Sequence, residues 1–325
     1  MREITFTEAA REGLAEEMRR DPTIIVLGEG IGPRGGNFQT TLGLFALYGE
    51  ERLRDTPISE AGFTGLCIGA ALTGLRPIVD IMFADFGLDA LGMLINQAAK
   101  LRYLSDGRLK VPLVFRGCMG GGNSSAAHHS GCYYPFFMHI PGFKVVIPAT
   151  PYDAKGLLKA AIRDDDPVVF LEHRFLLNTK GPVPEEEYLI PFGQAKVARE
   201  GKDATVVAIS LMVHKTLEAA ERLAGEGVSV EVIDPRTLAP LDMGTILKSV
   251  QKTGRLLIVD EDYGPCGAGA EIATQVAGQA LDYLDAPIRR VNLGFATMPF
   301  SPTLEKALLP NVDTITQAVR DLLAA

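Results

Sequence analysis

Short runs of apolar, β-branched residues alternate with helical patterns along the whole chain, and this alternation limits the possible folds most strongly. The runs are continuously apolar, which is typical of strands buried on both faces of a parallel sheet. Segments 62–74, 87–104 and 151–164 instead carry apolar residues at helical spacing. Strands that alternate with helices in this way predict an α/β fold. The expected strands of the first half are 23–27, 77–82, 111–115, 144–147 and 168–171.

The first helix has clear local signals. Thr5 and Glu8 have the spacing of a capping box, in which each residue satisfies a backbone N–H of the other. Ala10, Leu14 and Met18 then repeat at intervals of four, which places them on one face of a helix. We therefore predict an amphipathic helix that begins at this box.

The alternation is interrupted between residues 178 and 202. Within this stretch, 178–191 carries three prolines and the acidic run 185–187, which is typical of an extended linker. Strand and helix patterns then resume, with strands expected near 204–209, 228–233, 255–260 and 288–292. We therefore predict a first domain at 1–185, a linker at 186–202 and a second domain at 203–325.

Composition excludes several classes of protein. The chain has 325 residues, 47% hydrophobic and 22% charged, as in a globular protein rather than a disordered one. A net charge of −8 argues against nucleic-acid binding, which relies on clustered Lys and Arg. Neither a run of about 18 apolar residues nor a signal-peptide pattern is present, so we expect a cytoplasmic protein without a membrane partner. The four cysteines form no metal-binding motif, and we expect buried free thiols at Cys67, Cys118, Cys132 and Cys266.

Chemistry is expected after the strands, because open parallel sheets bind ligands outside the carboxyl ends of their strands. The segments in question are 28–30, 59–60, 83–86 and 117–130. Glu60 allows two interpretations from these residues alone. It is either a first-turn glutamate stabilised by the helix dipole, or a carboxylate in an apolar setting whose raised pKa suits proton transfer.

Glycines and histidines cluster in the last of these segments. The Gly-rich run 117–122 could let the backbone approach a ligand closely, but it lacks the Lys-Ser/Thr ending of a phosphate loop. The pair His128-His129 is either a solvated loop pair or includes a histidine that moves a proton or stabilises an oxyanion. The glycines of 264–269 have the wrong spacing for a dinucleotide fingerprint, and no GxSxG motif indicates a serine hydrolase. The run 164–166 is expected to be a surface turn.

Segment 55–65, DTPISEAGFTG, resembles the thiamine-site segment of the beta subunit of 2-oxo acid dehydrogenases. These are the decarboxylating first components of the pyruvate, branched-chain and acetoin dehydrogenase complexes. The resemblance extends in order over essentially the whole chain. It includes 28–29, 96–100, 141–146, 153–158, 161–167, 231–242, 304–305 and 309–310.

The resemblance implies a fold, a cofactor and partners. The fold would be a pyrimidine-binding α/β domain with a parallel sheet, followed by a transketolase C-terminal-like α/β domain. Thiamine diphosphate would lie between unlike subunits in an assembly of two alpha and two beta chains, which acylates the lipoyl groups of an acyltransferase core. The GDG…N signature for magnesium and diphosphate is absent, so the resemblance places the magnesium ligands on the alpha subunit.

The resemblance also implies roles for single residues. Glu60 would hydrogen-bond the aminopyrimidine ring and exchange a proton with it, and Phe86 would lie against that ring. His129 would help to bind substrate and direct acyl transfer, with His128 beside it. Glu29 matches an acidic cofactor-site residue linked to proton communication between active sites. Some members hold potassium through backbone carbonyls, which correspond here to Leu113, Ala161, Asp164 and Asp166.

Three departures from the family pattern affect these expectations. The usual Gln-His-Ser-Gln is His128-His129-Ser130-Gly131, the usual Asp-Gln before Asn96 is Gly92-Met93, and Cys118 replaces a common proline. The first departure changes two residues next to His129, so the substrate contacts can differ from those of the family. Two alternative functions stay open: half of a split transketolase, and a docking subunit without catalytic function.

Overall fold

A computed structural model describes residues 1–325, which divide into two compact units. The first unit comprises Met1–Met119 and Phe136–Phe192, and the second comprises Gly120–Pro135 and Gly193–Ala325. Each unit is an α/β structure built on a mostly parallel sheet, which confirms the predicted fold class. None of the helices is both long and apolar enough to cross a membrane.

The sheet of the first unit has the strand order β6-β7-β5-β4-β2-β3, and all of these neighbours pair in parallel. Parallel strands require crossover connections, and helices supply most of them, including α3 (Glu60–Leu72) and α7 (Pro151–Arg163), whereas α1 (Phe6–Arg20) precedes the first strand of this sheet. The strands are β2 (Ile24–Gly28), β3 (Leu53–Asp55), β4 (Arg76–Phe83), β5 (Val114–Met119), β6 (Lys144–Val146) and β7 (Val168–His173).

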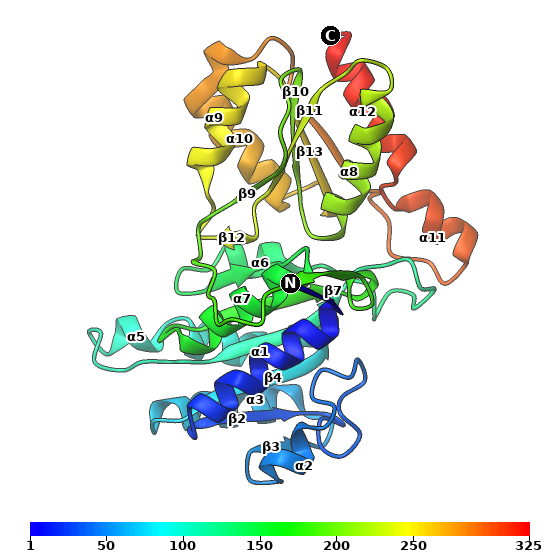
Figure 1. The fold of residues 1–325 in the computed structure, drawn as a ribbon. Coiled ribbons are helices and arrows are strands. Elements are labelled where there is room, and N and C mark those ends of the chain that lie inside the picture. The colour runs from blue at the N-terminus through cyan, green and yellow to red at the C-terminus, as the bar shows by residue number, and fades with distance from the viewer. The chain divides into compact units, whose positions relative to one another are not determined.

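The sheet of the second unit has the order β14-β13-β10-β11-β9, in which only β9 is antiparallel to its neighbour (Figure 1). Its strands are β9 (Lys196–Arg199), β10 (Ala204–Ala208), β11 (Val230–Asp234), β13 (Leu256–Tyr263) and β14 (Arg289–Leu293). Helices α9 (Met243–Thr253) and α10 (Ala268–Ala280) bury Ile246, Val250, Ile272 and Val276 against this sheet. The remaining helices are α8 (Leu211–Ala224), α11 (Pro302–Leu308) and α12 (Val312–Leu323).

Three local expectations were wrong in detail. Segment 87–104 is not one helix but a series of short helical turns, because Gly87 and Gly92 are poor helix formers. Strand β5 begins at Val114 rather than at 111, and Pro112 lacks the N–H that a central strand donates. Within 178–191, whose composition is typical of an extended linker, residues Lys180–Val183 form β8, which pairs antiparallel with β1 (Arg2–Thr5). The turns between β4 and β5 are Ala84–Leu88, Leu91–Met93, Leu94–Ala98 and α5 (Leu101–Leu104).

The start of α1 confirms the predicted capping box. The Thr5 hydroxyl accepts a hydrogen bond from the Glu8 N–H at 3.2 Å, and the Glu8 carboxylate accepts one from the Thr5 N–H at 2.8 Å. The expected apolar face is also present, since Ala10, Leu14 and Met18 are buried. The local sequence therefore determines both where α1 begins and which face it packs.

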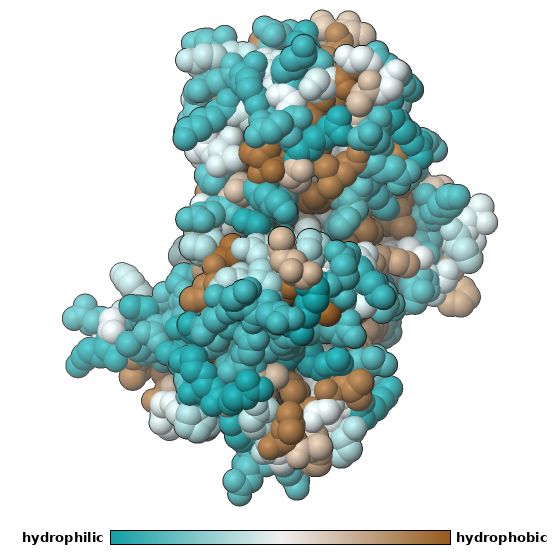
Figure 2. Space-filling view, viewed as in Figure 1, coloured by the Kyte–Doolittle hydropathy of each residue, from teal (hydrophilic) through white to brown (hydrophobic).

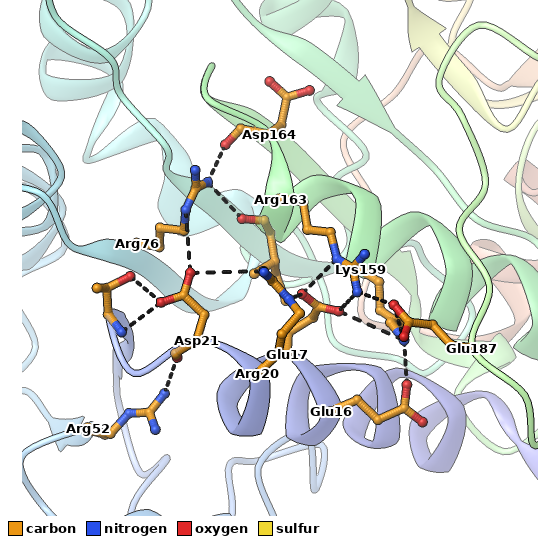
Figure 3. Close-up of polar contacts among 12 residues, drawn as sticks. Glu16, Glu17, Arg20, Asp21, Arg52, Arg76, Lys159, Arg163, Asp164 and Glu187 are labelled. Atoms are coloured by element: carbon orange, nitrogen blue, oxygen red, sulfur yellow. Dashed lines mark hydrogen bonds and ion pairs between the residues drawn. The ribbon is translucent and has the colours of Figure 1, made fainter.

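An ion-pair ladder joins α1 to α7 (Figure 3). Residues four apart lie on the same face of a helix, and α7 carries basic residues at this spacing opposite acidic residues of α1. The Glu17 carboxylate accepts hydrogen bonds from Arg163 at 2.7 and 2.9 Å and from Arg20 at 2.7 Å. The ladder also pairs Lys155 with Glu12 and Glu16, and Lys159 with Glu16. In the space-filling view, hydrophilic residues cover α1, whereas a hydrophobic patch lies near α2 (Leu44–Tyr48), where Leu47 is exposed (Figure 2).

The chain after β8 packs along α7 and extends the ladder. The Tyr188 ring stacks on Tyr152 with centroids 4.5 Å apart, and the Tyr188 hydroxyl donates to the Tyr152 carbonyl at 2.8 Å. Glu187 adds a carboxylate that pairs with Arg163. Residues of the predicted linker are therefore docked on the first unit.

We expect Glu17→Gln to lower the free energy of unfolding by about 2–3 kcal/mol, because an amide replaces a buried carboxylate that accepts hydrogen bonds from two arginines. Urea unfolding of the full chain would measure this difference. Glu226→Gln is the matched control, since Glu226 pairs with Arg320 at an exposed site where ion pairs contribute little. Equal unfolding curves for the two variants would show that the ladder does not stabilise the fold.

Candidate functional site

The structure places Glu29, Glu60 and Phe86 directly after three neighbouring strands of the first sheet. Glu29 follows β2, Glu60 begins α3 after β3, and Phe86 lies in the turn Ala84–Leu88 after β4. The strands β3, β2 and β4 are adjacent and parallel, so their carboxyl ends meet at one edge of the sheet. This edge is where α/β proteins bind ligands.

Backbone contacts join the segments that carry Glu29 and Glu60. The Thr56 N–H donates to the Gly28 carbonyl at 3.1 Å, and the Gly32 N–H donates to the Asp55 carboxylate at 2.9 Å. A Cβ at position 28 would lie 2.3 Å from the Asp80 carbonyl, so only glycine allows β2 to approach β4 this closely. These hydrogen bonds hold together the turns that follow β2 and β3.

The carboxylates of Glu29 and Glu60 interact electrostatically. Partial burial raises the pKa of Glu29, and the negative charge of Glu60 raises it further. Two hydroxyl oxygens on either side of Glu60 in the sequence are buried without a hydrogen-bond partner in the chain: Thr56 Oγ1 before α3 and Thr64 Oγ1 within α3. The chain around Glu60 therefore combines two interacting carboxylates with polar atoms that lack partners, as expected at a ligand site.

Aromatic rings lie at the end of β4. Phe86 and Phe83 pack edge to face with centroids 5.8 Å apart, and Phe83 packs in the same way on Phe38 at 5.3 Å. The Arg174 guanidinium lies 5.5 Å from the centre of the Phe83 ring. These contacts hold Phe86 through its neighbour Phe83.

A buried ion pair under this edge was not expected from the sequence. Arg116 of β5 donates to the Glu172 carboxylate of β7 at 2.7 and 3.0 Å, and these residues are only 2% and 3% exposed. Burial alone would lower the pKa of Arg116, but the charges of Glu172 and Asp80 raise it above its usual value. A charged residue directly after each of two apolar runs, 111–115 and 168–171, was the signal that could have identified the pair.

The structure does not place the two histidines in the same unit as Glu60. His128 and His129 belong to the segment Gly120–Pro135, which is part of the second unit. His128 is exposed and His129 is half-buried. Gly267 of the second glycine cluster precedes α10, and a Cβ there would lie 2.4 Å from the Tyr263 carbonyl, so this cluster forms a tight turn.

The acidic run 164–166 forms the predicted turn between α7 and β7, and its side chains are half-buried and paired. Arg76 donates to the Asp164 carbonyl at 2.8 Å and to the Asp165 carboxylate at 2.7 Å. Of the carbonyls predicted for potassium, Leu113 accepts from Val168 at 2.8 Å and Ala161 accepts from Asp164 at 3.3 Å. A carbonyl oxygen has a second lone pair, so these bonds leave room for a further ligand.

Three of the four cysteines match the expectation of buried free thiols. Cys67, Cys118 and Cys132 are buried, but Cys266 is exposed in the turn before α10. Burial raises the pKa of the Cys67 thiol to about 12, so this side chain stays protonated. The exposed Cys266 departs from the prediction because its turn lies outside the packed core.

Three consecutive carboxylates end β13 in the second unit. Asp260 is fully buried and its pKa is raised to about 6, mainly by burial, although a hydrogen bond from the Tyr134 hydroxyl opposes the shift. Burial and the charge of Asp260 raise the pKa of Asp262 to about 7. Glu261 lies between them and is also buried. These three residues were not predicted from the sequence.

Family models match both halves of the chain. Residues 2–180 match the transketolase pyrimidine-binding domain, and residues 193–315 match the transketolase C-terminal domain. In fold, the chain is similar to a solved structure described as a split-gene transketolase, an inactive beta4 tetramer. The TM-score is 0.80, with 24% sequence identity and coverage of 99% and 98% of the two chains.

Curated relatives match almost the full length of the chain. The chain is 47% identical to the beta subunit of acetoin:2,6-dichlorophenolindophenol oxidoreductase of Cupriavidus necator, over 98% of this chain and 97% of that protein. It is 44% identical to the 2-oxoisovalerate dehydrogenase beta subunit of Bacillus subtilis, over 98% of both chains. It is also 46% identical to the beta subunit of the pyruvate dehydrogenase first component of Rhizobium meliloti, over 98% of this chain and 70% of that protein.

The raised pKa of Asp262 predicts a pH-dependent effect on stability. A carboxyl group whose pKa is raised on folding favours the folded state below that pKa, and its ionised form opposes folding above it. We therefore expect Asp262→Asn to raise the melting temperature at pH 8.5, where Asp262 is ionised, and to change it much less at pH 5.5.

Differential scanning calorimetry at the two pH values would measure this effect. Asp282→Asn is the control, since Asp282 is exposed. An Asp262→Asn variant that melts lower than the wild type at pH 8.5 would contradict the expected cost of the buried charge.

Proposed function

Because this chain belongs to the family of beta subunits of 2-oxo acid dehydrogenases, we propose that it forms half of a thiamine-diphosphate-dependent active site. Together with an alpha subunit, it would decarboxylate a 2-oxo acid and transfer the acyl group to a lipoyl arm. The observation that carries this proposal is the near-full-length similarity to beta subunits of acetoin, pyruvate and 2-oxoisovalerate enzymes.

The first unit fits the aminopyrimidine half of the cofactor. Glu60 is half-buried and interacts electrostatically with Glu29, and the hydroxyls of Thr56, before α3, and Thr64, within α3, lack partners. The Glu60 carboxyl would hold a proton at its Oε atoms and exchange it with a ring nitrogen. Phe86 would offer its ring face, and Glu29 would tune the charge at Glu60.

Thiamine diphosphate, when bound, supplies the electron sink for loss of CO₂. The residues of this chain would bind and orient the ring and exclude water. We assign the substrate side of the site to His129, whose imidazole can donate a hydrogen bond to the substrate. His128 would replace a glutamine that is usual in the family. This imidazole in place of an amide would alter the contacts with the substrate.

Further components of the site are expected outside this chain. We propose an assembly of two alpha and two beta chains that docks on a lipoyl-bearing acyltransferase core, with the magnesium ligands on the alpha subunit. The carbonyls of Leu113, Ala161, Asp164 and Asp166 are the candidate ligands for potassium. Residues 1–185 would be the pyrimidine-binding domain, 186–202 the linker and 203–325 the transketolase C-terminal-like domain. A cytoplasmic location stays a prediction from the sequence.

Co-expression of this chain with an alpha subunit carrying GDG…N would test the activity. We expect reduction of 2,6-dichlorophenolindophenol with a 2-oxo acid or acetoin as substrate, and none without the alpha subunit. Turnover of ketose phosphates instead would favour a split transketolase, an alternative that the adjacent imidazoles of His128 and His129 keep open. An assembly that fails to bind thiamine diphosphate would favour a docking subunit.

Glu60→Gln tests the assigned proton exchange, because an amide cannot give up or take a proton at neutral pH. We expect decarboxylation to fall by about 100-fold or more, while assembly with the alpha subunit is retained. Glu50→Gln is the matched control, since Glu50 is exposed before β3. Wild-type rates in Glu60→Gln would falsify the role proposed for this carboxylate.

A further inference from the structure

The Gly-rich segment that precedes the histidines has its backbone N–H groups directed at carboxylates of its own chain. The Gly121 N–H donates to Glu261 at 2.8 Å, the Gly122 N–H donates to Glu305 at 2.7 Å, and the Ser124 N–H donates to Glu305 at 2.9 Å. All of these residues belong to the second unit. The donors and acceptors are separated by 140 to 183 positions in the sequence.

The backbone conformation of this segment explains why it presents several N–H groups together. Gly120 and Gly122 have φ values of +96° and +102°, and Ser124 has a φ value of +51°. Left-handed residues that alternate with ordinary ones turn successive N–H groups toward one side and form an anion-binding concavity. In this protein the anions are side-chain carboxylates, so the segment is not open to a phosphate group.

The two glutamates are almost completely buried. Glu305, on α11, is 2% exposed and Glu261, at the end of β13, is 5% exposed. Buried carboxylates require hydrogen-bond donors, and each oxygen of Glu305 accepts from a different N–H of the segment. The glutamates and the segment therefore stabilise each other.

A second anchor holds the other end of the same segment. The Tyr134 hydroxyl donates to the Asp260 carboxylate, next to Glu261 on β13. Within the segment, the Gly120 N–H donates to the Gly131 carbonyl at 3.4 Å. His128 and His129 thus lie on a loop that is fixed at both ends, and loop closure leaves them few conformations.

We infer that Glu305 and Glu261 are positioning residues, which hold the loop of His128 and His129 in the conformation that the reaction requires. They act through backbone N–H groups and do not touch the substrate. This inference rests on the proposed function and adds residues of the C-terminal part of the chain to the site of that reaction.

Glu305→Gln is the most direct test. The glutamine side chain has one acceptor oxygen, and its NH₂ group would face one of the two N–H donors of the loop. Hydrogen exchange of the full-length chain, assembled with its alpha subunit, should become at least about tenfold faster at residues 120–126. We also expect kcat/KM for lipoyl acylation to fall by about tenfold or more, while the affinity for thiamine diphosphate changes less than about twofold, because Glu60 is untouched.

Two further variants keep the test decisive. Glu271→Gln is the control, since Glu271 is an exposed residue of α10, and it should leave exchange and kinetics unchanged. Glu305→Asp keeps the charge but is too short to reach both N–H groups, and we expect exchange and kcat/KM between those of the wild type and Glu305→Gln. It is the variant to use if Glu305→Gln does not fold.

Different results would overturn the positioning role of Glu305 and the proposed function. Unchanged exchange in the Glu305 variants, or faster exchange with unchanged kcat/KM, would overturn the positioning role. An equal loss of cofactor affinity would also overturn it, because a general structural defect would then explain the kinetics. A wild-type assembly without turnover would instead refute the proposed function, and the exchange measurement would still decide whether Glu305 holds the loop.

Discussion

The buried ion pair between Arg116 and Glu172 is the interaction on which the first unit depends. Two charges in the middle of a sheet are tolerated only when each satisfies the other, and this pair is bidentate and almost completely buried. It joins β5 to β7, and Asp80 of β4 lies in register opposite Arg116. Three central strands are therefore held in one register at the edge where the candidate site lies.

A series of contacts connects this strand register to the aromatic residues of the candidate site. The chain leaves β7 at His173, and the next residue, Arg174, lies over the Phe83 ring. Phe83 in turn packs against Phe86, so the position of the aromatic side chain proposed for the cofactor depends on the pairing of β5 with β7. Glu29 and Glu60 are placed separately, through the backbone contacts between the ends of β2 and β3. The site edge thus has an aromatic side fixed by side-chain packing and an acidic side fixed by the backbone.

The features that the sequence predicted correctly are local. Continuous apolar runs predicted the parallel strands, and Thr5 with Glu8 predicted the start of α1, because each signal lies within a few residues. The pairing of β1 with β8 was missed because it joins residues almost 180 positions apart. The same limit applies to the proposed site: Glu29 and Glu60 could be proposed as site residues from the segments around them. The contacts of Glu261 and Glu305 could not, since neither has a local motif.

Long-range carboxylates also explain why the Gly-rich segment had no clear interpretation from its sequence. A run of glycines with left-handed residues indicates an anion site, but it does not say whether the anion is a ligand or a side chain. Free phosphate would compete with Glu305, whose two oxygens are held by the fold at hydrogen-bond distance from Gly122 and Ser124. An intramolecular partner has no loss of translational freedom on binding, so it has an advantage over a free anion for the concavity. The glycines therefore serve to connect the histidine loop with its own unit, and the chemistry proposed for the segment begins after them, at His128 and His129.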